Sequence, residues 1–414
     1  MICVRANKRG FVLIISYFII VILTMLVVSF LSSVIADNLI AYRYHGSVRA
    51  FWLAQSAVER AISELNYGAG KWIGWQDEAG AKVMKVSWPG FGEFSIRIAN
   101  VDSDNPFIVA QGFFPAEDSY NAIVRGIEVV AGRERNIFSY AAFGKSRVDL
   151  GGNPFTDSYN SLKGPYNEAG NKDYNGDVGS NGDIYFSGSS YYIGGDASTG
   201  CDGVFSDSDH VFGQITHSND EDLPAPAVPA ELVSLAVGQT IKQTQTLMPG
   251  NYKFKGIDLT GQSVLTIIGP ANIYLTGQLS IDLTGQGKIL ITEDSGPVRF
   301  YVDGDISISG QGVANDTKSP PNLLIFGTGG SNQKISIGGS GSLYGAIYAP
   351  DASINLEGVG TGGVVFGSVV GNNVSLSGSA AIHYDEALGA LRIQLGKFFV
   401  QSWKEISNPA RVVP

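Results

Sequence analysis

Cysteine is almost absent from this chain: its 414 residues contain two, Cys3 and Cys201. Cys3 precedes a long apolar run, so a membrane crossed by that run would separate the two thiols. Cys201 would then have no partner within the chain, which excludes an internal disulfide framework. Packing and hydrogen bonds must hold the fold together.

Charged residues are also sparse, at 16% of the chain, and the excess of acidic residues gives a formal net charge of −10. A surface with this balance repels phosphate backbones, which argues against general nucleic-acid binding. Hydrophobic residues reach 44%, too many for a chain that is disordered over most of its length. The four histidines, His45, His210, His217 and His383, show no metal-ligand spacing.

Glycine is scarce at the start of the chain and abundant afterwards. Of the 53 glycines, 11 fall in residues 1–133 and 42 in residues 134–414. No triplet period accompanies them, which excludes collagen. The shift marks a domain boundary, and the chain length leaves room for two or three domains.

One long uncharged run, residues 11–31, stands near the N-terminus. At about 1.5 Å per residue it spans roughly 30 Å, the thickness of a hydrocarbon core. Arg5, Lys8 and Arg9 precede it, and Asp37 is the first charge after it. Because basic flanks stay in the cytoplasm, we expect a single membrane-spanning helix with the following chain outside. A cleaved secretory signal peptide and a plain signal anchor are the alternatives.

The residues Lys8-Arg9-Gly10-Phe11, followed by this run, resemble the class III signal of type IV prepilins. In that family a prepilin peptidase cuts after the glycine, here Gly10, and the new first residue, here Phe11, is usually methylated. Residues 50–62, AFWLAQSAVERAI, resemble the second half of a PilX-like or minor pseudopilin helix. The resemblance covers roughly residues 8–66.

One position departs from the family pattern. Pilins usually carry glutamate at the fifth mature position, which is Ile15 here. In the family this carboxylate pairs with a neighbour's N-terminal amine during assembly. Its absence is more similar to minor subunits that sit at a filament tip or prime assembly. The resemblance implies three partners: the membrane, prepilin peptidase and other pilin-like subunits. It also implies location in the inner (cytoplasmic) membrane, with the bulk periplasmic or extracellular, or incorporated in a pilus.

The N-terminal part is expected to be α+β. We predict a leader at 1–10, a long helix at 11–66 and a small sheet region at 67–136. An apolar stripe at spacings of 3 and 4 would face the sheet, and it consists of Phe51, Ala54, Val58, Ala61 and Leu65. Alternating residues predict antiparallel strands at 83–87, 93–99, 107–111 and 122–130.

From about residue 137 the chain repeats an apolar-x-apolar-x-Gly unit. Copies start at Ile257, Ile281, Ile306, Ile335, Ile354 and Val374, spaced by 24, 25, 29, 19 and 20 residues, with earlier copies at Val148 and Ile184. A second apolar series, residues 323–327, 344–348 and 365–369, interleaves at the same period. Each unit cannot bury its own apolar face, whereas stacked units can. The pattern predicts a parallel β-helix (β-solenoid) over 137–385; a β-sandwich is the alternative.

Two further segments have distinct expectations. Residues 223–229, LPAPAVP, read as an extended connector because proline lacks a ladder donor. Residues 386–414 read as a helical cap and tail, with helical spacing through Leu388, Leu391, Leu395 and Phe398. Such a cap would cover the last turn of the solenoid.

Few residues point to chemistry. Asp173, Asn175 and Asp177 have the spacing of a calcium loop, but Val178 stands where glycine is expected. Asp258 and Asp282 occupy equivalent repeat positions and are expected to be solvated. The tyrosines 191–192 and Trp72 and Trp75 could stack on sugars, although packing is the simpler interpretation. No phosphate loop or nucleophile elbow is present, and we expect no cofactor and no enzyme activity.

The sequence therefore predicts a non-enzymatic minor pilin or pseudopilin-like component of a type IV pilus or type II secretion-like system. The solenoid would bind or act as a spacer, with surface glycans or host or abiotic surfaces as candidate partners. One alternative is a bitopic β-helix adhesin with no filament role. Another is a polysaccharide-active β-helix enzyme, which would need clustered outer acids.

Overall fold

The computed structural model describes residues 8–68, 72–101, 103, 105–188, 191–206, 209–309, 312–338, 342–358 and 364–406, with backbone alone at 8–14, 133–135 and 394–397. The chain divides into two compact units. The first contains residues 1–133 and 397–414, and the second contains residues 134–396.

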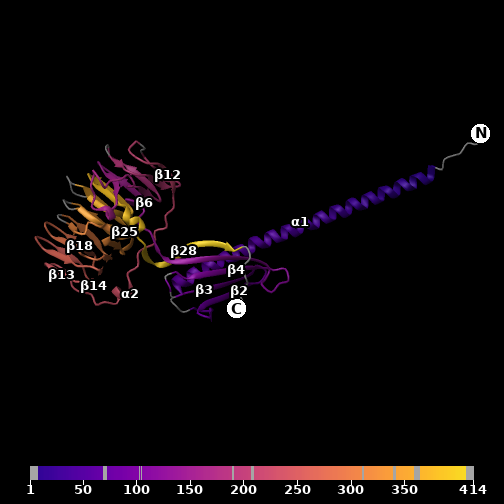
Figure 1. Cartoon of the computed structure of the whole chain (residues 1–414), viewed down its shortest axis with the longest axis horizontal. Coiled ribbons are helices and arrows are strands. Elements are labelled where there is room, and N and C mark those ends of the chain that lie inside the picture. Colours follow the sequence, from indigo (N-terminus) through magenta and orange to yellow (C-terminus); the bar gives the residue numbers. More distant parts are fainter. Residues whose placement is uncertain are drawn as a thin grey trace, which may run out of the picture. The chain divides into compact units, whose positions relative to one another are not determined.

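The first unit is built on one long helix and one sheet (Figure 1). Helix α1 (Lys8–Tyr67) has 60 residues and confirms the predicted helix, with its first turn reaching into the predicted leader. The sheet has the order β1-β2-β3-β4-β5-β28, and β1 to β5 are antiparallel neighbours. Its strands are β1 (Gln76–Glu78), β2 (Ala81–Trp88), β3 (Gly92–Ala99), β4 (Phe107–Phe114), β5 (Ile123–Arg135) and β28 (Ile393–Ile406). Four of these strands confirm the predicted ones.

The second half of α1 packs on this sheet. Ala54, Val58 and Ala61 of the predicted stripe are fully buried and share a core with Ile96 and Ile108 of the sheet. Phe51 and Leu65 are partly buried against the same core. Alternation along β3 and β4 presents one apolar face, so the helix stripe and the sheet cover each other.

The second unit consists of short stacked strands (Figure 1), and their parallel pairings form three ladders. The first ladder contains β14 (Gly250–Phe254), β17 (Ala271–Leu275), β20 (Val298–Val302), β23 (Leu323–Gly327), the middle of β25 (Ser342–Gly358) and of β26 (Val364–Gly378), the start of β6 (Ala142–Leu150), β8 (Val178–Ser180), β11 (Ala197–Gly200) and β12 (Ile215–Asn219). The interleaved apolar series falls in this ladder, where Leu324 faces Ala346 and Ala346 faces Ser368.

The repeated apolar-x-apolar-x-Gly units form the second ladder, in register. It contains β15 (Ile257–Leu259), β18 (Leu279–Leu283), β21 (Asp305–Ile308), β24 (Lys334–Ile337), the ends of β25, β26 and β6, and β9 (Asp183–Phe186). The apolar residues of each unit face the core: Ile257 and Leu259 are fully buried. Gly261 and Gly285 follow their units with φ of 63° and 64°, a conformation that strains other residues.

The third ladder completes the stack. It contains β13 (Gln245–Leu247), β16 (Val264–Ile267), β19 (Lys288–Ile291) and β22 (Gly312–Asn315), then the starts of β25 and β26, β27 (Ala381–Asp385), β7 (Phe155–Tyr159) and β10 (Tyr192–Ile193). The side chain of Asn315 joins the two parts, because its Nδ2 donates to the Tyr344 carbonyl at 2.9 Å. The described part of the second unit is thus mainly parallel β.

The stacking order differs from the sequence order. Strand β6 pairs with β26 on one side and with β8 and β9 on the other. Val148 therefore lies between Val374 and Ile184 in the second ladder. The N-terminal segment of this unit continues the stack beyond its C-terminal strands, so the chain enters and leaves the stack away from either end.

The predicted connector runs across the stack. After β12, Asn181 exchanges two hydrogen bonds with the backbone of Glu221, at 2.7 and 2.8 Å. Further on, the Tyr348 hydroxyl donates to the Pro224 carbonyl at 2.8 Å. The connector ends in α2 (Ala230–Val233), where Lys253 of β14 donates to the Val233 carbonyl at 2.6 Å. It thereby returns the chain from one end of the first ladder to the other.

The predicted C-terminal helical cap is wrong. Residues 386–390 form a short 3₁₀-helix, η4 (Glu386–Ala390), and β28 follows as an edge strand of the first unit's sheet. Asn66 fixes this strand by two hydrogen bonds with the Phe398 backbone, at 2.9 and 2.6 Å. Gly389 and Gly396 interrupt the predicted helix, each costing about 1 kcal/mol relative to alanine, and strand pairing prevails. Three other short 3₁₀-helices are η1 (Ser161–Lys163), η2 (Pro320–Asn322) and η3 (Gly330–Asn332).

Candidate functional site

The first half of α1 presents large apolar side chains outward. Met25, Phe30 and Ile35 are 68%, 70% and 68% exposed. By length and composition the helix from residue 15 onward can cross a membrane, and none of its apolar window is buried within the chain. Burying such side chains from water contributes roughly 1.5–3 kcal/mol each. This half of α1 is therefore compatible with a single-pass membrane anchor or a signal sequence.

The predicted processing residues lie at the start of this helix. The backbone of Gly10 and Phe11 belongs to α1, and the side chain of Phe11 lies outside the described residues. Ile15 is 42% exposed. Peptidase recognition and methylation at Gly10 and Phe11 remain predictions.

The predicted calcium loop divides its side chains among separate partners. Asp173 Oδ1 accepts from the Tyr174 amide at 2.8 Å, and Asn175 Nδ2 donates to Glu386 at 2.8 Å. Asp177 Oδ1 accepts from the Asp196 amide at 2.7 Å, and burial raises the pKa of Asp177. Among the described residues, no group of three His, Cys, Asp or Glu side chains could hold a metal. Asp173 thus caps its own turn, whereas Asn175 and Asp177 link this loop to distant segments.

The outward side chains of the second ladder form a surface of small polar groups. Successive strands present Asp258, Asp282, Ser307, Ser336, Asn355, Ser375, Asp149 and Tyr185. Asp258 and Asp282 are direct register partners, as their repeat positions predict, and both are half-buried. Lys242 pairs with Asp258 at 2.9 Å. This surface offers hydroxyl, amide and carboxylate groups at the regular strand spacing of about 4.8 Å.

A buried ionic cluster lies on the third ladder, and the sequence did not predict it. Asp157 is fully buried; its Oδ1 contacts His383 Nδ1, and its Oδ2 accepts from the Tyr166 hydroxyl at 2.7 Å. Lys172 Nζ lies 3.3 Å from the same Oδ2. The His383 ring stacks between neighbours, 4.0 Å from the Tyr166 ring and 4.8 Å from the Phe366 ring. Because 226 residues separate Asp157 from His383, no local spacing could reveal the pair.

Next to this cluster, Asp385 is buried with one oxygen satisfied. Its Oδ1 accepts from the Ser161 and Ala387 amides at 2.8 and 3.1 Å, while Oδ2 has no hydrogen-bond partner among the described residues. Burial raises the pKa of Asp385. Tyr159 faces Asp385 in the ladder, and burial, then the nearby Asp385 charge, raises the pKa of Tyr159.

The predicted sugar-stacking aromatics pack within the protein. Tyr191 is buried and stacks on Phe186 at 4.0 Å, and Tyr192 stacks on Phe155 at 5.5 Å. In the first unit, Trp72 and Trp75 meet edge to face and pack on the α1–sheet core. The ring faces that sugars would need are therefore largely covered.

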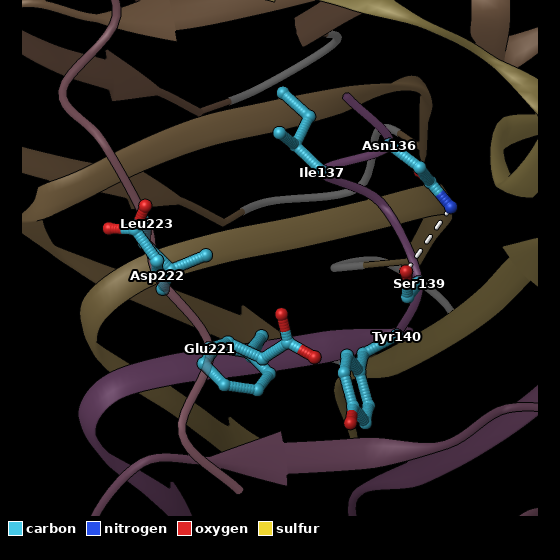
Figure 2. Close-up of a pocket in the computed structure, with 8 residues that line it drawn as sticks. Asn136, Ile137, Ser139, Tyr140, Glu221, Asp222 and Leu223 are labelled. Atoms are coloured by element: carbon cyan, nitrogen blue, oxygen red, sulfur yellow. Dashed lines mark hydrogen bonds between the residues drawn. The ribbon is translucent and has the colours of Figure 1, made fainter. Parts of the chain in front are cut away.

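A small cavity lies where the connector passes residues 136–143. Figure 2 shows Asn136, Ser139 and Tyr140 on one segment and Glu221 and Leu223 on the other. Its volume is about 20 Å³, room for about one water molecule. Burial, then the charge of Glu221, raises the pKa of Tyr140. The cavity is a packing feature of the connector and too small for a ligand.

Comparison with known proteins gives one family model and several distant structures, two of which are described here. A family model described as Domain of unknown function (DUF7305) matches residues 206–391, fewer than half of the chain. No curated protein matches the chain significantly. The ice-binding protein from the Antarctic ascomycete Antarctomyces psychrotrophicus is similar with 15% identity and a TM-score of 0.28, over 60% of this chain and 95% of that one. The competence-associated pilin ComZ from Thermus thermophilus is similar with 11% identity and a TM-score of 0.29, over 87% of this chain and 98% of that one. At these TM-scores neither likeness carries an argument.

Proposed function

We propose that this chain is a non-enzymatic, pilin-like component of a type IV pilus or type II secretion-like system. In this proposal α1 anchors the protein in the inner membrane, and the second unit is a closed β-solenoid exposed outside the cytoplasm. The solenoid serves as a binding or spacer module. Prepilin peptidase processes the chain between Gly10 and Phe11, and other pilin-like subunits assemble with it.

The observation that carries the proposal is the division of α1 into two halves. Its first half exposes apolar residues such as Phe30, whereas Ala54, Val58 and Ala61 of its second half are fully buried against the sheet. A soluble core helix would bury its apolar residues throughout. The first half of this continuous helix exposes apolar side chains, and its second half packs on a sheet. This arrangement suits a protein that joins a membrane to a folded head.

The β-solenoid reading is supported by the three parallel ladders. Consecutive strands of the chain belong to the first, second and third ladder in turn. The strands at 250–254, 257–259 and 264–267 are one example. A parallel β-helix has this repeated winding around one apolar core.

The binding role rests on the second ladder's polar surface. Its groups, such as Ser307, Ser336 and Asn355, are half-buried or exposed, and they repeat along the stack. Regularly spaced hydroxyl and amide groups suit surface glycans or other polar host or abiotic surfaces as partners.

A bitopic membrane-anchored adhesin without a filament role is the second candidate. It is favoured by Ile15, which stands where pilins usually carry the assembly glutamate. The two candidates share the anchor and the solenoid, and they differ in whether the leader is removed.

The anchor can be tested by fractionating cells that express the full chain. We expect the protein in the membrane fraction after alkaline carbonate washing and its release by detergent. A Leu26→Arg variant should move toward the soluble or degraded fraction, because a central arginine costs about 2.5–3.5 kcal/mol on insertion. Leu26→Ile is the matched control and should behave as wild type. Wild-type protein that is freely soluble at full length would contradict both candidates.

A further inference from the structure

One end of the three-ladder stack is formed by residues 204–219. In the first ladder β12 is the terminal strand, and its register partner among the described strands is β11. Phe205 and Val211 end the second and third ladders through single bridges to Ile184 and Ile193. Phe205, Val211 and Ile215 are only partly buried, since the core contacts them from one side. This end presents apolar side chains and an unpaired strand edge.

The other end is formed by residues 237–247. Gly238 ends the first ladder by a bridge to Phe254, Ile241 ends the second by a bridge to Ile257, and β13 ends the third. Ile241 and Leu247 face the core and are buried, whereas Val237 and Met248 are 45% and 58% exposed. Strand edges and these two exposed apolar side chains therefore lie at this end.

The two ends match in winding and polarity. Toward the first end the chain passes through 197–200, 204–206, 210–212 and 215–219, visiting the first, second, third and first ladders. From the second end it passes through 238, 241, 245–247 and 250–254 in the same ladder order. All the ladder strands are parallel, so a second copy placed head to tail would continue all three ladders with the same strand direction.

The ends also differ in charge. Residues 204–219 contain two acidic residues and no Lys or Arg, whereas residues 237–247 contain one lysine, Lys242, and no acidic residue. Opposite charges on the two ends favour contact between unlike ends and disfavour contact between like ends.

We propose that two copies of this chain bind head to tail, with β12 of one copy against residues 237–239 of the next, so that each ladder is continued by the same ladder of its neighbour. Strand addition supplies backbone hydrogen bonds, and the apolar residues at both ends are covered. Because the contact joins unlike surfaces, it leaves one free end on each side and permits further copies to add. The inference rests on the ladders and is independent of the membrane role.

Site-directed disulfide cross-linking of the full chain in detergent tests the proposal. In a background with Cys3→Ser and Cys201→Ser, one variant carries Thr216→Cys on β12 and a second carries Val237→Cys at the other end. Parallel neighbours place facing Cα atoms within the 4.4–6.8 Å range, roughly, that a disulfide needs. Mixing the two variants under mild oxidation should give a cross-linked dimer at least several-fold above either variant alone. A Ser336→Cys variant, exposed on the second ladder, is the control for random collision.

Two results would overturn the head-to-tail contact. One is a Thr216→Cys variant that cross-links to itself as well as to Val237→Cys. The other is a mixed yield no higher than that of Ser336→Cys. Circular dichroism of each variant confirms that the β fold is retained.

Discussion

Gly112 of β4 lies directly beneath the carbonyl oxygen of Ala50 in α1. A Cβ atom at Gly112 would stand 1.9 Å from that oxygen and 2.7 Å from the Ala54 amide nitrogen. Real Cβ atoms do not approach so closely, so glycine is the residue that lets helix and sheet meet here. The contact fixes the second half of α1 on its sheet.

Replacing this glycine should loosen the first unit. We expect Gly112→Val to lower the free energy of unfolding by about 2 kcal/mol or more, because overpacking a core costs about 1–3 kcal/mol. Gly170→Val is the control, since its Cβ would meet only the Asn167 side chain at 3.9 Å. Thermal unfolding of the detergent-solubilised chain, followed by circular dichroism, measures both, and equal shifts would contradict the packing account.

The buried cluster around Asp157 should contribute strongly to the second unit's stability. Asp157→Asn removes a charge that contacts His383, Lys172 and the Tyr166 hydroxyl. Breaking a buried pair typically costs about 3–5 kcal/mol. The control is Asp149→Asn, whose partner Arg147 lies at 2.8 Å and is half exposed, where a loss of about 0–1 kcal/mol is expected. Urea denaturation compares the two, and similar midpoints would refute the buried role.

Asp385 should make stability depend on pH. Burial raises its pKa above the ordinary carboxyl value of about 3.9, so the native state holds its proton more tightly than the unfolded state. The favourable contribution is fully present below about pH 4 and is lost as pH rises through the raised folded pKa. We expect Asp385→Asn to gain stability relative to wild type between pH 4 and pH 7.

Melting temperatures at several pH values check this sign. The half-buried Asp282 of the second ladder supplies the control variant Asp282→Asn. A difference between Asp385→Asn and wild type that shrinks with rising pH would show that the buried carboxyl does not act as described.

Local patterns in the sequence predicted most elements. The stripe through Ala54 and Val58 gave the helix face, and the units at Ile257 and Ile281 gave the register of the second ladder, because alternation and turn glycines are local signals. The order of the stack was not predictable, since the pairing of Val148 with Val374 depends on contacts across 226 residues. The pair of Asp157 and His383 was missed for the same reason.

The prediction of a C-terminal helix was wrong for a different reason. Leu388, Leu391 and Phe398 have helical spacing, yet β28 joins the sheet through hydrogen bonds between Phe398 and Asn66. The helical pattern is weak and interrupted by two glycines, so the segment instead pairs as a strand with the free edge of the sheet. The long apolar helix, in contrast, was evident from an uncharged run, which is a local signal that needs no tertiary information.

The mass of the mature N-terminus tests the central claim most directly. Protein purified from the membrane fraction of a host with prepilin peptidase should begin at Phe11, with the mass of one added methyl group. A Gly10→Val variant should keep its leader and supplies the matched control. An intact Met1 on the wild-type protein in that fraction would contradict the pilin-like account and leave the bitopic adhesin.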